Sequence, residues 1–222
     1  MRDRSRARQR FTAPDMTDIV LLRHGQTEWD RQNRLHGHVP VPLTETGYDS
    51  VTAIGRRLAS QYDFDRMYAA DTMAARETAA LVRLTGLGPR PQFEAAWRPR
   101  DAGVFQGLAY DELGDGMTDD LDTDVDVLQP LPRGGEPLAD GRARVLDRWE
   151  RLCERSNADE QVLVVTHDFP MATILADIDD AGSVADLGRY APGKCSMTTV
   201  RRTVAETTIG ESDTQIGQFA NG

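Results

Sequence analysis

Short apolar runs alternate with amphipathic stretches along most of this chain. The runs at 19–22 (Ile-Val-Leu-Leu) and 162–165 (Val-Leu-Val-Val) are β-branched or leucine throughout, as is typical of strands buried on both faces. Three further strands are predicted at residues 65–69, 92–94 and 197–203. The clearest strand, 161–166, ends directly before His167.

Three stretches have the apolar period of a helix. Thr44 is a suitable cap for a helix that runs to about Ser60. A second helix is predicted over 72–84, and a third after Pro137, which suits a first helical turn. The apolar faces consist of Val51, Ile54 and Leu58 in the first, Ala75, Ala79 and Val82 in the second, and Leu138, Val145, Leu146, Trp149 and Leu152 in the third.

Strands that alternate with helices indicate an α/β fold with a mostly parallel central sheet and helices on both faces. We expect the domain to span residues 16–204. Residues 1–15 are expected to be a disordered basic tail or an extension upstream of a start at Met16, and 205–222 a polar C-terminal tail. Residues 111–126 hold eight acidic residues and no basic one, without the spacing of a calcium loop, so 108–132 is interpreted as an acidic specificity loop.

Charge and composition narrow the choice of partners. The 222 residues carry a net charge of -10; because residues 1–15 contribute +3, the remainder carries -13. Such an acidic body argues against nucleic acid and anionic membranes as partners, and no apolar run approaches the ~20 residues of a membrane span. Cys153 and Cys195 have neither metal nor disulfide spacing, which favours free thiols and a cytoplasmic location.

The candidate chemistry lies where two strands end. Arg23 and His24 follow the first buried strand and His167 follows the strand 161–166, and ligands of parallel sheets bind beyond the carboxyl ends of strands. A guanidinium can clamp a phosphate, and an imidazole can attack its phosphorus. Gly25 lets the backbone approach an anion, and Thr27 adds a donor. These residues predict a phosphate site.

The same residues resemble a known family. Residues 21–29 (LLRHGQTEW) are similar to the L-x-R-H-G-x-T-x-W signature of the histidine phosphatase (phosphoglycerate mutase-like) superfamily. The resemblance covers roughly residues 18–170 in the expected order. It continues through 33–37 (NRLHG), 42–47 (PLTETG), 76–80 (RETAA), 103–108 (GVFQGL), 134–136 (GGE) and 164–167 (VVTH).

The resemblance implies a three-layer αβα sandwich and a mechanism without metal or other cofactor. His24 would be the nucleophile that forms a phosphohistidine, and Arg23 and His167 would hold the phosphoryl oxygens. The substrate would be a small phosphorylated molecule. The implied substrate-binding residues are Gly25, Gln26, Thr27, Asp30, Arg34 and Asp168.

Three positions depart from the family pattern. Ala74 stands where the family has a second arginine, and Arg76 lies about 200° further round the helix. Pro99 stands where the family has the glutamate that donates a proton. Asp101, nearby in the sequence, is a candidate for a weak replacement. Asp30 replaces an asparagine, and a carboxylate repels phosphate unless it is protonated or paired.

We therefore expect a weak or specialised phosphomonoesterase that favours leaving groups needing no proton. Three alternatives stay open: a non-catalytic relative that binds a phosphorylated ligand or partner, a phosphoglycerate mutase, and a zinc site. The zinc site would use His24, His36, His38 and His167. A homodimer is compatible with the sequence, which does not name the substrate.

Overall fold

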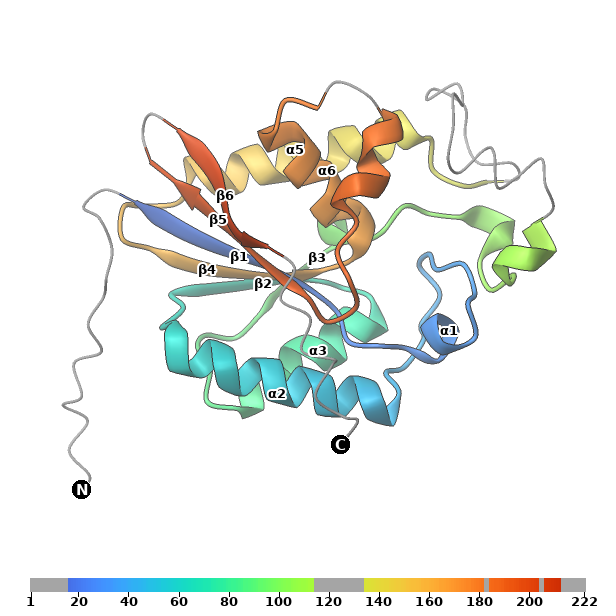
Figure 1. Ribbon diagram of the computed structural model, residues 1–222, viewed down its shortest axis with the longest axis horizontal. Helices are drawn as coiled ribbons and strands as arrows, with labels where there is room; N and C mark the ends of the chain where they lie inside the picture. Colours follow the sequence, from blue (N-terminus) through green and yellow to red (C-terminus); the bar gives the residue numbers. More distant parts are fainter. Residues whose placement is uncertain (1–15, 114–133, 182–183, 204–205, 213–222) are drawn as a thin grey trace.

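The computed structural model describes residues 16–113, 134–181, 184–203 and 206–212 (Figure 1). The expectations for residues 1–15, for 114–132 of the acidic loop and for 213–222 lie outside the described residues. A six-stranded mixed sheet forms the middle of the molecule, with strand order β3-β2-β4-β1-β5-β6. The strands are β1 (Thr17–Arg23), β2 (Arg66–Ala70), β3 (Gln92–Glu94), β4 (Gln161–Thr166), β5 (Met197–Arg202) and β6 (Thr207–Ser212).

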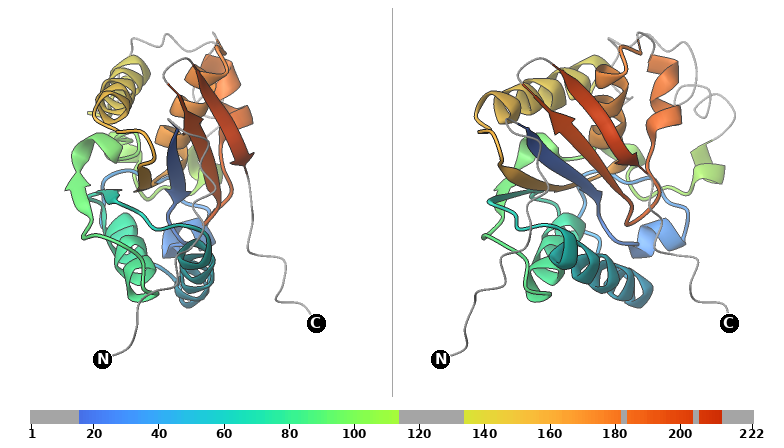
Figure 2. Two further views of the ribbon diagram at one scale, coloured as in Figure 1. Left: turned by 90° about the vertical axis from the view of Figure 1, so that its left-hand side faces the viewer. Right: turned by 60° about the vertical axis from the view of Figure 1, so that its left-hand side comes forward.

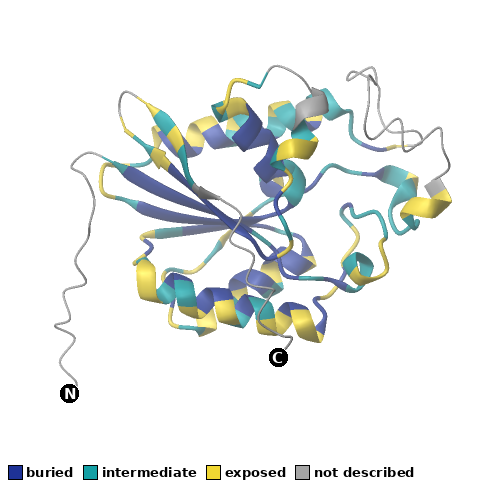
Figure 3. Ribbon diagram, in the orientation of Figure 1, coloured by how far each residue is buried: buried dark blue, intermediate teal, exposed yellow. Residues whose placement is uncertain are grey.

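Four of these strands, β1 to β4, run parallel, and β5 and β6 are antiparallel additions beside β1. The apolar residues of β1 and β4 are fully buried, as their unbroken hydrophobic runs predict (Figure 3). The register pairs Arg23 of β1 with Thr166 of β4. The two strands therefore end side by side, and the residues that follow them emerge as neighbours.

Helices cover both faces of the sheet. The helices α2 (Glu45–Gln61) and α3 (Met73–Leu84) lie on one face, and α5 (Leu138–Glu154) and α6 (Asp168–Ile178) on the other (Figure 2). Thr44 caps α2 by accepting a hydrogen bond from the backbone of Gly47. Short pieces complete the chain: α1 (Glu28–Arg31) and the 3₁₀ turns Ala95–Trp97, Gly103–Phe105, Tyr110–Leu113 and Val184–Tyr190. The three-layer αβα architecture is confirmed.

The predicted helices and strands are confirmed, but three elements were not foreseen. The helix α6 has no polar face, because Pro170 to Ala176 are all buried, so it has no amphipathic period to detect. The helix α1 is one short turn. The prediction of a polar tail from residue 205 is wrong for Thr207–Ser212, which pair with β5 as the edge strand β6; backbone hydrogen bonds form that pairing whatever the side chains.

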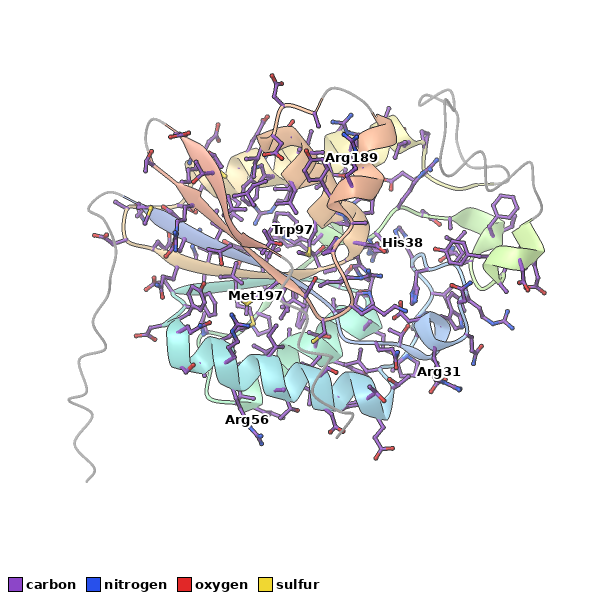
Figure 4. All side chains as sticks on the ribbon, in the orientation of Figure 1. Arg31, His38, Arg56, Trp97, Arg189 and Met197 are labelled. Carbon is purple, nitrogen blue, oxygen red and sulfur yellow. The ribbon has the colours of Figure 1, made fainter. Side chains whose placement is uncertain are left out.

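No helix in the described part of the chain is long and apolar enough to cross a membrane. Trp97, labelled in Figure 4, is fully buried near the centre of the molecule. Its backbone carbonyl accepts a hydrogen bond of 2.7 Å from the hydroxyl of Thr166, the last residue of β4. The core therefore fixes the end of β4, directly before His167.

Candidate active site

His24 and His167 meet where β1 and β4 end. Their ring centroids are 4.5 Å apart, and both side chains are buried. The backbone N–H of His24 donates to the carbonyl of Thr166 at 3.0 Å, so the sheet pairing extends to the first of the two histidines. The predicted convergence of the two imidazoles is present in the structure.

The ring of His24 is held in one tautomer. Its Nδ1–H donates to the carbonyl of Gly25 at 2.8 Å, which leaves the lone pair on Nε2. Burial, together with the positive charge of Arg23, lowers the pKa of His24 to about 4, although Asp30 opposes this shift. The imidazole is therefore neutral at pH 7, as a nucleophile must be.

Gly25 is fixed by crowding. A Cβ at this position would meet the Val51 side chain at 2.6 Å and the carbonyl of Gly47 at 3.0 Å, so a larger residue would push the loop away from α2. The N–H of Gly25 donates to the hydroxyl of Thr78 at 3.1 Å. The loop that carries His24 thus contacts both α2 and α3.

The ring of His167 is oriented by a residue that follows β2, the strand next to β4. Its Nε2 lies 2.8 Å from the hydroxyl of Thr72, the residue that precedes α3. Burial lowers the pKa of His167 well below its ordinary value, and the charge on a protonated His24 would lower it further. Both imidazoles are neutral in the unliganded protein, and a bound phosphate dianion would favour their protonated forms.

Arg23 lies beside them with its side chain almost covered. Its Nη1 donates to the carbonyl of Pro192 at 2.7 Å, and its Nη2 lies 2.9 Å from the carboxylate of Asp168. Within the described structure, Nε is buried without a hydrogen-bond partner. An incoming phosphate must therefore share this guanidinium with Asp168.

Asp30 is the most enclosed carboxylate of the site, with 4% of its side chain exposed. Its Oδ2 accepts hydrogen bonds of 2.8 Å from both the N–H and the hydroxyl of Thr27, which closes a capping box on α1. Its Oδ1 faces His36 at 3.5 Å, Lys194 at 3.7 Å and Arg23 at 3.8 Å. Burial alone would raise the pKa of Asp30, but the interactions with His36 and the N–H of Thr27 outweigh it and hold that pKa well below its usual range. The replaced asparagine has thus become an ionised, paired carboxylate.

His36 and Lys194 also lie at the site, although the sequence did not assign either of them to phosphate binding. His36 lies with its ring centroid 5.8 Å from that of His24, and its Nε2 is 3.0 Å from the hydroxyl of Thr27. Lys194 comes from the loop before β5, far along the chain, and donates to the backbone carbonyl of Asp30 at 3.3 Å. Its one sequence signal was that it is the single lysine of the chain.

The sequence profile of the histidine phosphatase superfamily (branch 1) matches residues 19–212. The chain belongs to this superfamily. It is 33% identical to a 2,3-bisphosphoglycerate-dependent phosphoglycerate mutase of Methylobacterium radiotolerans, over 90% of this chain and 98% of that protein. It is 29% identical to a metal-independent phosphoserine phosphatase of Arabidopsis thaliana, over 78% and 73%. The crystal structure of a Bacillus anthracis phosphoglycerate mutase superposes with a TM-score of 0.76 at 21% identity, covering 90% and 93%.

Two residues that the histidine phosphatase pattern assigns to the substrate point elsewhere. The side chain of Gln26 accepts a hydrogen bond of 2.9 Å from the hydroxyl of Thr44. The guanidinium of Arg34 donates to the carbonyl of Gly107 at 2.5 Å and to Gln32 at 2.9 Å. Both side chains fix loops around the site, and these contacts do not bring them to His24.

The part of the site at Ala74 and Pro99, called the rim below, lacks two groups of the histidine phosphatase pattern. These are the second arginine and the glutamate that donates a proton. Ala74 is buried in the first turn of α3, where it presents only a methyl group. The guanidinium of Arg76 donates to the carbonyl of Asp71 at 2.8 Å and lies 4.1 Å from the centre of the Phe93 ring. The guanidinium of Arg76 therefore packs against Asp71 and Phe93 and does not replace an arginine at position 74.

Pro99 and Asp101 shape the rest of this rim. The carbonyl of Pro99 accepts hydrogen bonds from His38 at 3.1 Å and Arg144 at 3.3 Å. Asp101 accepts from the N–H of Gly103 at 2.8 Å and from Gln106 at 3.1 Å. Asp101 thus stabilises its own turn, and these contacts give it no role on a leaving group.

The zinc alternative is contradicted. No group of three histidine, cysteine, aspartate or glutamate residues in the described segments is placed to hold a metal ion. His38, labelled in Figure 4, has its two ring nitrogens toward Pro99 and Asp101, whereas His24, His36 and His167 gather around one another. The four histidines therefore do not form one ligand set.

Proposed function

We propose that this protein hydrolyses small phosphomonoesters through a phosphohistidine on His24. One observation carries the proposal: a neutral imidazole, fixed by Gly25, packs 4.5 Å from that of His167 beside the guanidinium of Arg23. This arrangement supports His24 as the nucleophile, with His167 and Arg23 stabilising the negative charge that develops on the phosphoryl group. The free, buried thiols of Cys153 and Cys195 support a cytoplasmic location for this activity.

The reaction proceeds in two displacements. The Nε2 lone pair of His24 attacks phosphorus, the P–N bond forms, and the bond from phosphorus to the ester oxygen breaks with the electron pair leaving on that oxygen. Arg23 and a protonated His167 neutralise charge on the phosphoryl oxygens. Water then attacks the phosphohistidine, the P–N bond breaks, and inorganic phosphate leaves the neutral imidazole.

The rim sets which esters react. Because Pro99 has no proton to give, the leaving oxygen departs as an anion, which favours aryl and acyl phosphates over alkyl phosphates. A missing general acid lowers rates by roughly 10²–10⁴-fold. A missing charge-stabilising donor costs about 2.7–4 kcal/mol more. We therefore infer a slow or specialised phosphatase.

A second candidate is a phosphate-binding relative without turnover. It is favoured by the two carboxylates, Asp30 and Asp168, that pair with Arg23 and compete with a phosphate for it. A mutase is favoured by the relative from Methylobacterium, but a mutase also has to hold a second anionic group, and Ala74 removes a cation from the site.

The deciding experiment combines turnover with trapping. Purified protein is incubated with p-nitrophenyl phosphate and with glycerol phosphate, and an acid-labile phosphohistidine is sought by mass spectrometry. We expect faster turnover of the aryl ester and loss of both signals in His24→Ala. The matched control is His38→Ala, which removes a histidine outside the cluster and should retain both. Equal turnover of the two esters would contradict the role given to Pro99, and phosphate binding without any phosphohistidine would favour the second candidate.

A further inference from the structure

Lys194 is attached to the site more firmly than an ordinary surface lysine. The loop that carries it is bound to Arg23 and His24 on both sides of residue 194. The guanidinium of Arg23 donates to the carbonyl of Pro192 at 2.7 Å, and its backbone N–H donates to the carbonyl of Ser196 at 3.0 Å. The N–H of Cys195 donates to the carbonyl of His24 at 3.1 Å. Any ligand that contacts Arg23 and His24 is therefore close to the root of the Lys194 side chain.

The ammonium group also keeps most of its capacity to bind. Its closest partner is the carbonyl of Asp30 at 3.3 Å, and the carboxylate oxygen Oδ1 lies at 3.7 Å, beyond the usual hydrogen-bond range of about 2.7–3.2 Å. The side chain is 42% exposed, so the group can turn toward a ligand from solvent. A lysine has three donors, which makes it a point charge well suited to phosphate.

The charges of the site favour a second cation near a bound phosphate. Arg23 is balanced by Asp168 and Asp30, and the neighbouring imidazoles His24 and His167 are neutral in the unliganded protein. A bound phosphate dianion would favour protonation of these imidazoles, but it would also lie beside an ionised Asp30 and would share the fixed charge of Arg23 with two carboxylates.

We propose that Lys194 supplies the second fixed positive charge on the bound phosphoryl group, in place of the arginine that is absent at position 74. The cation comes from the loop before β5 instead of from α3. This inference rests on the phosphate site of the proposed function, but it requires only binding and not turnover.

The single lysine makes a direct test feasible. An amine-reactive acetylating reagent can label only Lys194 and the α-amino group at the N-terminus, which serves as an internal reference. Labelling is followed by mass spectrometry with inorganic phosphate or with sodium chloride of equal ionic strength. We expect phosphate to slow labelling of Lys194 at least fivefold and to leave the α-amino group unchanged. Equal slowing of both amines, or of neither, would overturn the proposal.

Substitution tests the charge itself. Lys194→Met keeps an apolar stem of similar length, and Lys194→Arg keeps the charge. We expect the Met variant to weaken binding of inorganic phosphate about tenfold, measured by calorimetry, and the Arg variant to retain most of the affinity. Arg201→Met, which removes an exposed cation that pairs with Asp18, is the matched control and should bind like the wild type. A Met variant within twofold of the wild type would sink the proposal.

A second background separates a direct contact from an indirect one. In Asp30→Asn, Lys194 no longer has a carboxylate to neutralise, so a direct contact predicts that Lys194→Met still weakens phosphate binding. A loss that disappears in this background would show that the lysine acts only on Asp30, and it would overturn the proposal. Because labelling and calorimetry can both be repeated in His24→Ala, a failure of phosphohistidine formation is distinguishable from a failure of Lys194.

Discussion

The two sides of the phosphate site differ in how their side chains are used. On the strand side, His24, His167 and Arg23 come from the paired ends of β1 and β4 and lie close together. On the rim side, Ala74 and Pro99 offer neither charge nor proton. In the proposed mechanism, separate elements hold the phosphoryl group and assist its leaving group, so one function can be lost while the other is retained.

The rim is nevertheless stabilised by ion pairs and hydrogen bonds of its own. Arg98 forms a bidentate ion pair with Asp71 at 2.5 and 2.6 Å. Arg144 binds both carboxylate oxygens of Glu136 at 2.8 Å and donates to the carbonyl of Ala96 at 2.8 Å. These charges are satisfied by one another, which fixes the turn around Pro99 without providing a group for the substrate. The turn around Pro99 is therefore well ordered by ion pairs even though it carries no acid at position 99.

The largest effect should come from the strand side. We expect His167→Gln to lower kcat on p-nitrophenyl phosphate by about 10²–10³-fold, because the amide cannot carry the positive charge that stabilises the phosphoryl oxygens. Thr72→Val, which removes only the hydroxyl that orients His167, should lower kcat by a few-fold. If His167→Gln retained more than a tenth of the wild-type rate, the strand side would not be the catalytic side.

A smaller effect should appear in stability against pH. The pKa of His24 is about 4 in the folded protein and 6.5 in the unfolded chain, so between these values the unfolded chain binds more protons. Stability should therefore fall as pH falls through this window, by about 2 kcal/mol from pH 7 to pH 5 for His24 alone. Urea unfolding at the two pH values should give a smaller difference for His24→Gln than for the wild type. Identical differences would show that His24 is not held neutral by the fold.

The sequence predicted the strand side because its signal is local. A buried run followed at once by Arg23-His24, and another followed by His167, places those residues at strand ends whatever the rest of the fold does. His36 and Lys194 were not assigned to phosphate, since their place depends on how loops fold back over the site. The sequence also left open whether Asp30 is paired. In the structure its carboxylate lies near Arg23, His36 and Lys194 and accepts hydrogen bonds from Thr27.

The smallest effect, and the one that tests whether the two sides are separable, is a gain on the rim. Pro99→Glu puts a carboxylic acid at the position of the family's proton donor, on a turn whose backbone His38 and Arg144 already hold. We expect turnover of glycerol phosphate to rise about tenfold, and turnover of p-nitrophenyl phosphate to rise less, because a phenolate needs little help from an acid. Pro99→Gln has the same shape without the proton and should give no rise. If Glu and Gln raised both rates equally, the gain would come from freeing the turn of its proline, and the rim would then act on the strand side through the backbone instead of through a proton.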